Sequence, residues 1–207
     1  MDEVLAPAAG VRFVESLPLP RRRRRTPGGG GGSAGSDYDA RIVREGVVPT
    51  RPGSFHDLMN ALVWAAFPRA KAAVHARQLG FVERARAEGT VGRRTKAHDA
   101  LAILDEGGVL VAAREPLGSE AELEAALALG TARQLVFGHG IYESLAIDGP
   151  RPLVGALVVP WGASWPTRDD DLREALDAAV KDRLEGECAP VAPQEYLRVP
   201  VPTIWAA

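Results

Sequence analysis

Residues 48–64 read VPTRPGSFHDLMNALVW, and this stretch carries the strongest structural signal in the chain. A Pro/Gly turn leads to Ser54, and a Ser followed three positions later by an acidic residue, here Asp57, is typical of a helix start. The expected helix is apolar except near its beginning, where His56, Asp57 and Asn60 stand. Burial of an unpaired polar group costs about 1–3 kcal/mol. We therefore expect these side chains either to be hydrogen-bonded in the core or to belong to a functional site.

The rest of the chain predicts further helices and a few strands. Apolar residues at helical spacing behind Ser or Thr caps favour helices, and short apolar runs beside Gly favour strands. The expected elements are helices over residues 70–87, 119–130, 139–147 and 167–184, strands over 134–137 and 153–160, a hairpin over 100–112 with Asp105, Glu106, Gly107 and Gly108 at its turn, and an extended segment over 196–205. Helices dominate, and we expect the small sheet to be antiparallel. The predicted class is α+β, mostly helical.

A low-complexity tract near the N-terminus suggests how the chain is divided. Arg21–Arg25 repel one another, and Gly28–Gly32 lose much entropy on ordering. We expect residues 1–20 to pack on the body and residues 21–36 to be a disordered Arg/Gly-rich insertion. Residues 37–207 have a suitable length for a single globular domain.

Composition excludes several classes of protein. The longest unbroken apolar stretch, Ala61–Phe67, is far shorter than the ~20 residues needed to cross a bilayer, so no membrane span is expected. Residues 37–207 carry 19 Lys/Arg against 24 Asp/Glu, which argues against dedicated binding of duplex nucleic acid. Cys188 is the only cysteine, so neither an internal disulfide nor a Cys-based zinc site is expected. Together with an acidic N-terminal start that lacks an apolar core, this predicts a cytoplasmic location.

The first polar pair of interest is His56 with Asn60. The two residues are four apart, so they project from one side of the expected helix. In a functional interpretation, His56 is a general base or a metal ligand that Asn60 helps to orient. In a structural interpretation, Asp57 caps the helix, Asn60 bonds to the backbone and His56 pairs with a nearby loop. Both interpretations remain open from the residue types.

The second polar pair is His139 with Glu143. These residues are also four apart, a spacing that lets an imidazole and a carboxylate share a metal ion or a proton. The pattern lacks the second His of the zinc-protease helix motif, so a surface His/Glu pair is the alternative. The adjacent carboxylates Asp105 and Glu106 are explained by their expected position at the tip of the hairpin.

A basic region follows the first helix. Between Arg69 and Lys96 there are eight basic residues and two acidic ones. Arg51 and Lys71 are therefore candidates to hold an anionic substrate. A solvated helix surface explains the same charges without any ligand.

Several short motifs together resemble a bacterial family catalogued as domain of unknown function 3025. They are VPTR and HDLMNALVW within residues 48–64, FPRAKAA at 67–73, DAL and LDEG within 99–107, FGH and YE within 137–143, and PVP with Trp205 near the end. The resemblance implies membership of that family but carries no reaction with it. It includes the polar positions His56, Asp57, Asn60, Lys71, Asp105, Glu106, His139 and Glu143. The chain departs from the family pattern at His75 and His98, and the Arg/Gly tract is an insertion.

Two hypotheses of different classes follow. In the first, the protein is a hydrolase in which His56, Asp57, His139 and Glu143 gather around a divalent metal or act as acid and base. Arg51 and Lys71 would then hold an anionic, phosphate-bearing substrate. In the second, the protein is a non-catalytic interaction module whose buried polar network fixes helix packing. The Arg tract and the Pro-rich C-terminal segment would then meet its partners.

Overall fold

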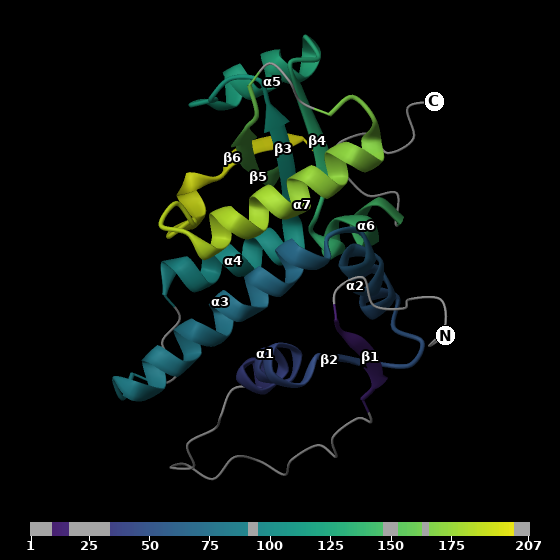
Figure 1. The fold of residues 1–207 in the computed structure, drawn as a ribbon, viewed down its shortest axis with the longest axis vertical. Helices are drawn as coiled ribbons and strands as arrows, with labels where there is room; N and C mark the ends of the chain where they lie inside the picture. The colour runs from purple at the N-terminus through teal and green to yellow at the C-terminus, as the bar shows by residue number, and fades with distance from the viewer. Residues whose placement is uncertain (1–9, 17–33, 91–94, 147–152, 163–165, 201–207) are drawn as a thin grey trace.

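The computed structural model describes residues 10–16, 34–90, 95–146, 153–162 and 166–200. In these residues the chain forms seven α-helices, six strands and one 3-10 turn, which confirms the α+β class (Figure 1). In chain order the elements are β1 (Arg12–Glu15), α1 (Ala34–Glu45), β2 (Val47–Thr50), α2 (Phe55–Ala66), α3 (Pro68–Ala87), α4 (Lys96–Gly107), β3 (Gly108–Ala113), α5 (Glu120–Ala128), β4 (Ala132–Val136), α6 (His139–Ala146), β5 (Leu153–Pro160), α7 (Asp169–Glu185), η1 (Pro193–Glu195) and β6 (Leu197–Pro200). Among these helices, none combines the length and the apolar character that crossing a bilayer requires.

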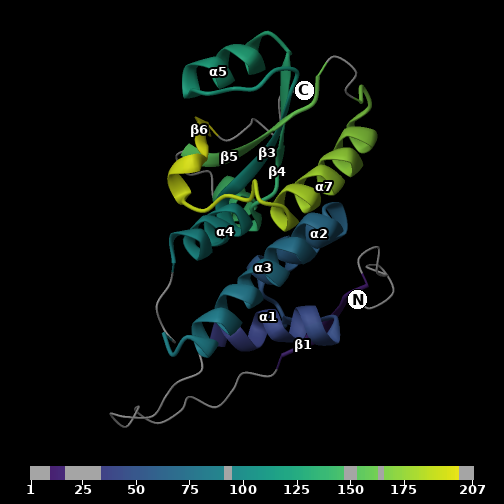
Figure 2. The ribbon, with the colours of Figure 1, turned by 60° about the vertical axis from the view of Figure 1, so that its left-hand side comes forward.

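The main sheet has the strand order β4-β3-β5-β6 and is mixed rather than antiparallel as expected. β3 pairs antiparallel with β4, but it runs parallel to β5, because the long connection through α5, β4 and α6 returns the chain to the same end of the sheet. Every residue of β3 is buried. Leu110 and Ala112 pack in one core with α4 and α7, and Val109 and Val111 pack in a second core with α5. α5 and α7 thus cover opposite faces of the sheet (Figure 2).

The hairpin expected over residues 100–112 is wrong. Its first half is the helix α4, which begins at a Thr95 cap whose hydroxyl accepts a hydrogen bond from the backbone N–H of His98. Leu101 and Leu104 are fully buried at helical spacing. The Gly pair that suggested a turn instead marks a tight passage from helix to strand, because a Cβ at Gly108 would lie 2.5 Å from the carbonyl oxygen of Leu104. The carboxylates that follow Leu104 therefore lie on the last turn of a helix and not at a hairpin tip.

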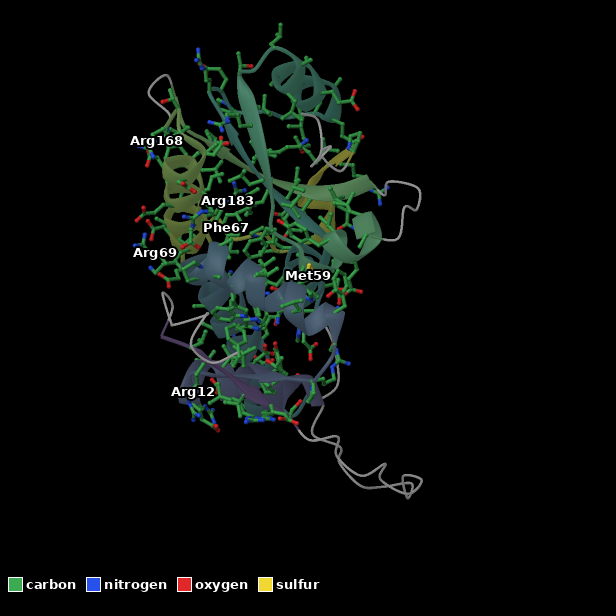
Figure 3. The ribbon with its side chains drawn as sticks, turned by 90° about the vertical axis from the view of Figure 1, so that its right-hand side faces the viewer. Arg12, Met59, Phe67, Arg69, Arg168 and Arg183 are labelled. Atoms are coloured by element: carbon green, nitrogen blue, oxygen red, sulfur yellow. The ribbon has the colours of Figure 1, made fainter. Side chains whose placement is uncertain are left out.

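The start of α2 is confirmed as expected. The Ser54 hydroxyl accepts a hydrogen bond from the backbone N–H of Asp57 at 3.2 Å. α2 ends at Ala66 with Phe67 as its cap, and Pro68 occupies the first turn of α3, where its missing N–H is not needed. Phe67 is buried between α7 and this helix pair (Figure 3) and packs against the ring of Phe137. The Phe67–Pro68 junction thus fixes the direction of α2 relative to α3.

The N-terminal strand β1 belongs to a second sheet of two strands. β1 pairs in parallel with β2, and Val11 is buried in a small core with Val48 and Trp64. α1 begins at Ala34, so the last residues of the expected insertion are helical, and residues 21–33 lie outside the described part.

α7 begins at Asp169 without a side-chain cap, so the expected Thr167 cap is wrong.

Candidate metal centre

Two histidines that are 83 positions apart in the sequence face each other in the fold. His56 lies in the first turn of α2, and His139 is the first residue of α6. These two helices pack side by side (Figure 1). The Nε2 atoms of the two rings are 3.1 Å apart, and the rings meet edge to face with their centroids 4.5 Å apart. Two nitrogen ligands of one tetrahedral zinc ion would be about 3.3 Å apart, so the spacing suits a shared metal ion.

The other nitrogen of each ring is held by an acceptor. Nδ1 of His56 lies 2.6 Å from a carboxylate oxygen of Glu143, and Nδ1 of His139 lies 2.9 Å from the backbone carbonyl oxygen of Asp105. A carbonyl or ionised carboxylate can only accept, so both Nδ1 atoms must carry the proton and donate. The Nε2 atoms of both rings then face the same point, beside the carboxylate of Glu106. Metal-binding histidines are oriented in this way by carboxylate or carbonyl partners.

Glu106 completes a set of three ligand groups. Its Oε2 lies 3.1 Å from Nε2 of His139. Ligand atoms of His56, Glu106 and His139 all lie within 4.8 Å of one another. The Glu106 side chain is 59% exposed, whereas that of His139 is only 5% exposed. The cluster is therefore anchored in the protein on one side and open to solvent on the other, as a catalytic site with a free coordination position would be.

Both carboxylates at the end of α4 are ionised at neutral pH. A hydrogen bond from His139 lowers the pKa of Glu106. Burial alone would raise the pKa of Asp105, but the charges of Lys71, His75 and His139 outweigh it and bring this pKa to about 2. The negative charge needed to attract a divalent cation is thus present.

Gly140 makes room for the Glu106 carboxylate. A Cβ at this position would lie 2.6 Å from Oε1 of Glu106. We expect Gly140→Ala to push this carboxylate away from His139 and to weaken zinc affinity roughly tenfold. Competition titration with a chelator of known affinity measures the change. The matched control is Gly80→Ala in α3, where an added Cβ meets nothing within 4 Å, so that zinc affinity should not change. Equal zinc affinity in both variants would contradict the assigned role of Glu106.

Glu143 holds the ring of His56 and would make it a better ligand for a metal ion. We expect Glu143→Ala to weaken zinc binding about 10–100-fold, because the loss of such a partner frees the ring and lowers its basicity. Glu143→Gln should lose less, since the amide oxygen still accepts from Nδ1. The control is Glu124→Ala on the exposed side of α5. Unchanged affinity in Glu143→Ala would show that this carboxylate does not support the ring.

Lys71 does not face the solvent as a substrate-binding residue would. Its side chain is fully buried, with Nζ 2.6 Å from Oδ1 of Asp105 and 5.9 Å from the ring centroids of both Trp64 and Phe137. Asp105 in turn supplies the carbonyl oxygen that holds His139. Lys71 therefore fixes the last turn of α4, from which Glu106 also comes, and we do not propose it as an anion-binding residue.

Asn60 does not orient His56 as the sequence suggested. Its Nδ2 donates to the hydroxyl of Tyr38 at 3.2 Å, within a buried network on the α1 side of α2. In the same network, His75 pairs with Asp39 at 2.9 Å and stacks on Trp64 with an interplanar angle of 4°. The structural interpretation expected Asn60 to bond to the backbone, and this detail is wrong, because its partner is the Tyr38 side chain. A buried polar network between α1, α2 and α3 is nonetheless present, as the interaction-module hypothesis expects.

Asp57 and Arg51 bind each other instead of contacting the histidines. The Arg51 guanidinium donates to both carboxylate oxygens of Asp57, at 2.7 and 3.0 Å, and the Arg51 backbone N–H donates at 2.6 Å. These hydrogen bonds lower the pKa of Asp57. The pair closes the turn before α2, while the Arg51 side chain remains 63% exposed.

The structure therefore brings together His56, His139 and Glu143 from the predicted set and adds Glu106 and the Asp105 carbonyl. The two additions were missed because their segment was assigned to a hairpin turn. The signal that could have found them is helical: Glu106 lies on the turn that follows Leu101 and Leu104, which marks α4.

A comparison with known families agrees with the resemblance found in the sequence. The model of the family described as "Protein of unknown function (DUF3025)" matches residues 30–206, most of the chain. Comparisons with curated proteins and with solved structures gave no match. The matched range contains every residue of the candidate metal centre, and the chain belongs to the DUF3025 family.

Proposed function

We propose that this protein is a metal-dependent hydrolase that acts on an anionic substrate, with a divalent ion, zinc by preference, held by His56, His139 and Glu106. Zinc is commonly bound by two histidines and one carboxylate in hydrolytic enzymes, with a fourth position left for water. Such a bound water has a pKa of about 7, so that it supplies a nucleophile at neutral pH. A single cysteine forms no internal disulfide, which suits a reducing compartment. We therefore also propose that the protein acts in the cytoplasm.

One observation carries the proposal, namely that the two Nε2 atoms approach each other to 3.1 Å while acceptors hold both Nδ1 atoms. Two Nε2 lone pairs at this distance would repel each other unless a proton or a metal ion lay between them. The carboxylate of Glu106 approaches the same point. A site with three donors and a side open to solvent favours a metal ion over a structural proton.

Metal analysis of the purified full chain tests this proposal. We expect one equivalent of zinc after metal-free protein is loaded and dialysed, and cobalt substitution should give the visible absorption of a four- or five-coordinate ion. The loaded protein is then assayed with 4-nitrophenyl phosphate, bis(4-nitrophenyl) phosphate and 4-nitrophenyl acetate. Retention of less than a tenth of an equivalent of metal would overturn the metal centre. Stable binding of ferrous iron together with no hydrolysis would overturn the hydrolase assignment, because two histidines and one carboxylate also hold the iron of oxygenases.

A second candidate function is the non-catalytic interaction module, which the buried pairs Asp39–His75 and Lys71–Asp105 favour. In that case the histidine cluster is one more part of the packing network. Removal of an imidazole would then lower the melting temperature of metal-free protein strongly, and added zinc would not change the melting temperature of the wild type. The two candidates thus differ in a single thermal measurement with and without metal.

A further inference from the structure

A groove of about 520 Å³ adjoins the candidate metal centre. It lies between α4, α6, β5 and the segment from η1 to β6. Its lining includes Ile103, Glu106, Gly140, Ser144, Tyr196 and Arg198. Glu106 and Gly140 belong to both the groove and the metal centre, so a molecule in the groove would lie against the carboxylate that we assign to the metal. The volume is within the range of about 300–1,000 Å³ that is usual for sites of small molecules.

We propose that this groove is the substrate site and that it binds a small molecule with an apolar body and one anionic oxygen group, such as a phosphate or a carboxylate, which Arg198 holds. This inference rests on the proposed hydrolase function and adds a substrate class to it. Arginine suits the task because its planar guanidinium pairs with two oxygens of an anion at once.

Arg198 is the one cationic residue among those that line the groove in the described part of the chain. Its backbone N–H donates to a carboxylate oxygen of Glu120 at 3.2 Å, which fixes the position of β6. The described residues offer its guanidinium neither a hydrogen bond nor an ion pair. By contrast, the guanidinium groups of Arg51 and Arg183 are engaged with a carboxylate and with backbone carbonyls, respectively.

The neighbouring strand carries no side chain opposite Arg198. In the antiparallel pairing of β5 and β6, Gly155 is the direct partner of Arg198, and directly opposed residues project to the same face of a sheet. A Cβ at Gly155 would lie 3.2 Å from the Tyr196 side chain, so only glycine lets Tyr196 pack this closely on β5. Gly155, Tyr196 and Arg198 all line the groove, so the guanidinium shares it with the aromatic ring.

The walls of the groove are largely apolar. Ile103 is 41% exposed although it is a large hydrophobic residue, and Ile141 and the ring of Tyr196 form the buried side. The Tyr196 hydroxyl donates to the backbone carbonyl of Ala100 at 3.0 Å, which holds the ring in place. A flat apolar body fits these surfaces, and its anionic group would reach Arg198.

Binding of phenylphosphonate tests the proposal, because its carbon–phosphorus bond resists hydrolysis. Affinity is measured by titration calorimetry on metal-free and on zinc-loaded protein. Benzoate replaces the phosphonate by a carboxylate, benzyl alcohol removes the charge, and inorganic phosphate removes the apolar body. We expect Arg198→Gln to weaken phenylphosphonate binding at least tenfold in both forms and to leave zinc affinity unchanged. The matched control is Arg41→Gln on α1, which should not alter probe binding.

The outcomes separate this proposal from the proposed function. Equal phenylphosphonate affinity in the wild type and Arg198→Gln would overturn the groove, even if zinc binds and hydrolysis occurs. If the protein takes up no metal but still binds phenylphosphonate in a way that depends on Arg198, the substrate site in the groove is supported and the metal-dependent hydrolase function is overturned. Equal affinity for phenylphosphonate and benzyl alcohol would also overturn the anionic substrate class, and the ratio of phenylphosphonate to benzoate affinity identifies which anion is preferred.

Discussion

Replacement of His139 by asparagine is expected to reduce zinc affinity by roughly a hundredfold or more. Loss of a supporting residue alone costs about 10–100-fold in such sites, and His139 supplies a ligand atom itself. Asparagine is chosen because its side-chain amide can still donate to the carbonyl oxygen of Asp105, which Nδ1 of His139 does at 2.9 Å. The substitution thus removes Nε2 from the cluster and keeps the buried hydrogen bond. Isothermal titration of metal-free protein with zinc measures the effect.

The control for this substitution is His98→Asn. His98 lies in the first turn of α4, outside the three-residue cluster, and its ring approaches that of Phe81. Zinc affinity of this variant should equal that of the wild type. If His139→Asn retains the wild-type affinity while both metal-free variants melt as the wild type does, the metal centre is wrong.

Replacement of Lys71 by methionine is expected to lower the free energy of unfolding by about 3–5 kcal/mol. Removal of one partner from a buried ion pair leaves the other charge buried without a counter-charge. The stability lost in this way exceeds the net stabilisation that the intact pair provides. Asp105, whose Oδ1 accepts from Nζ at 2.6 Å, would be left in that state. Methionine fills nearly the same volume, so little of the loss would come from a cavity. Urea unfolding of metal-free protein measures the change.

The control pair for Lys71→Met is chosen at the surface. Lys181 donates to Glu185 at 2.6 Å, but the side chain of Glu185 is 55% exposed and solvent replaces the contact. Lys181→Met should therefore hardly move the urea midpoint. In Lys71→Met with Asp105→Asn, much of the lost stability should return, because no charge is left buried. Equal, small losses in Lys71→Met and Lys181→Met would show that the buried pair is unimportant.

The same pair predicts a dependence on pH. The folded-state pKa of Asp105 is about 2, below its ordinary value of 3.8, so ionised Asp105 stabilises the fold above about pH 4. This stabilisation is lost as the pH falls from about 4 to about 2. Without the Lys71 charge, the pKa of Asp105 should be higher than in the wild type, because the largest influence that lowers it is gone. Protonation of Asp105 at low pH should therefore cost the variant less stability than it costs the wild type. The difference in free energy of unfolding between the wild type and Lys71→Met should therefore become smaller as the pH falls from 7 to 3.

Local chemistry predicted most of the helices and strands. The Ser54 cap of α2 depends only on residues close together in the sequence, and it is found where expected. The hairpin failed because a Gly pair can serve either as a turn or as a close contact. Which of these applies at Gly108 depends on the approach of the Leu104 backbone.

The candidate site was predictable only in pieces. The spacing of His56 with Asn60, and of His139 with Glu143, marked the two helices but could not say that they pack together. The structure pairs Asn60 with Tyr38 and Lys71 with Asp105, so spacing along one helix did not identify the true partners. Partner choice is set by contacts between elements far apart in the sequence, which no local pattern contains.

The origin of the three candidate ligand groups in three separate helices has a thermodynamic consequence. His56, Glu106 and His139 come from α2, α4 and α6, and an unfolded chain has no reason to hold them near one another. An ion that binds only the folded chain acts as a reversible cross-link and shifts the unfolding equilibrium by mass action, by about 2.7 kcal/mol at a concentration one hundred times its dissociation constant. Cellular metal supply would then set how long each copy of this protein survives proteolysis, even before any substrate is considered.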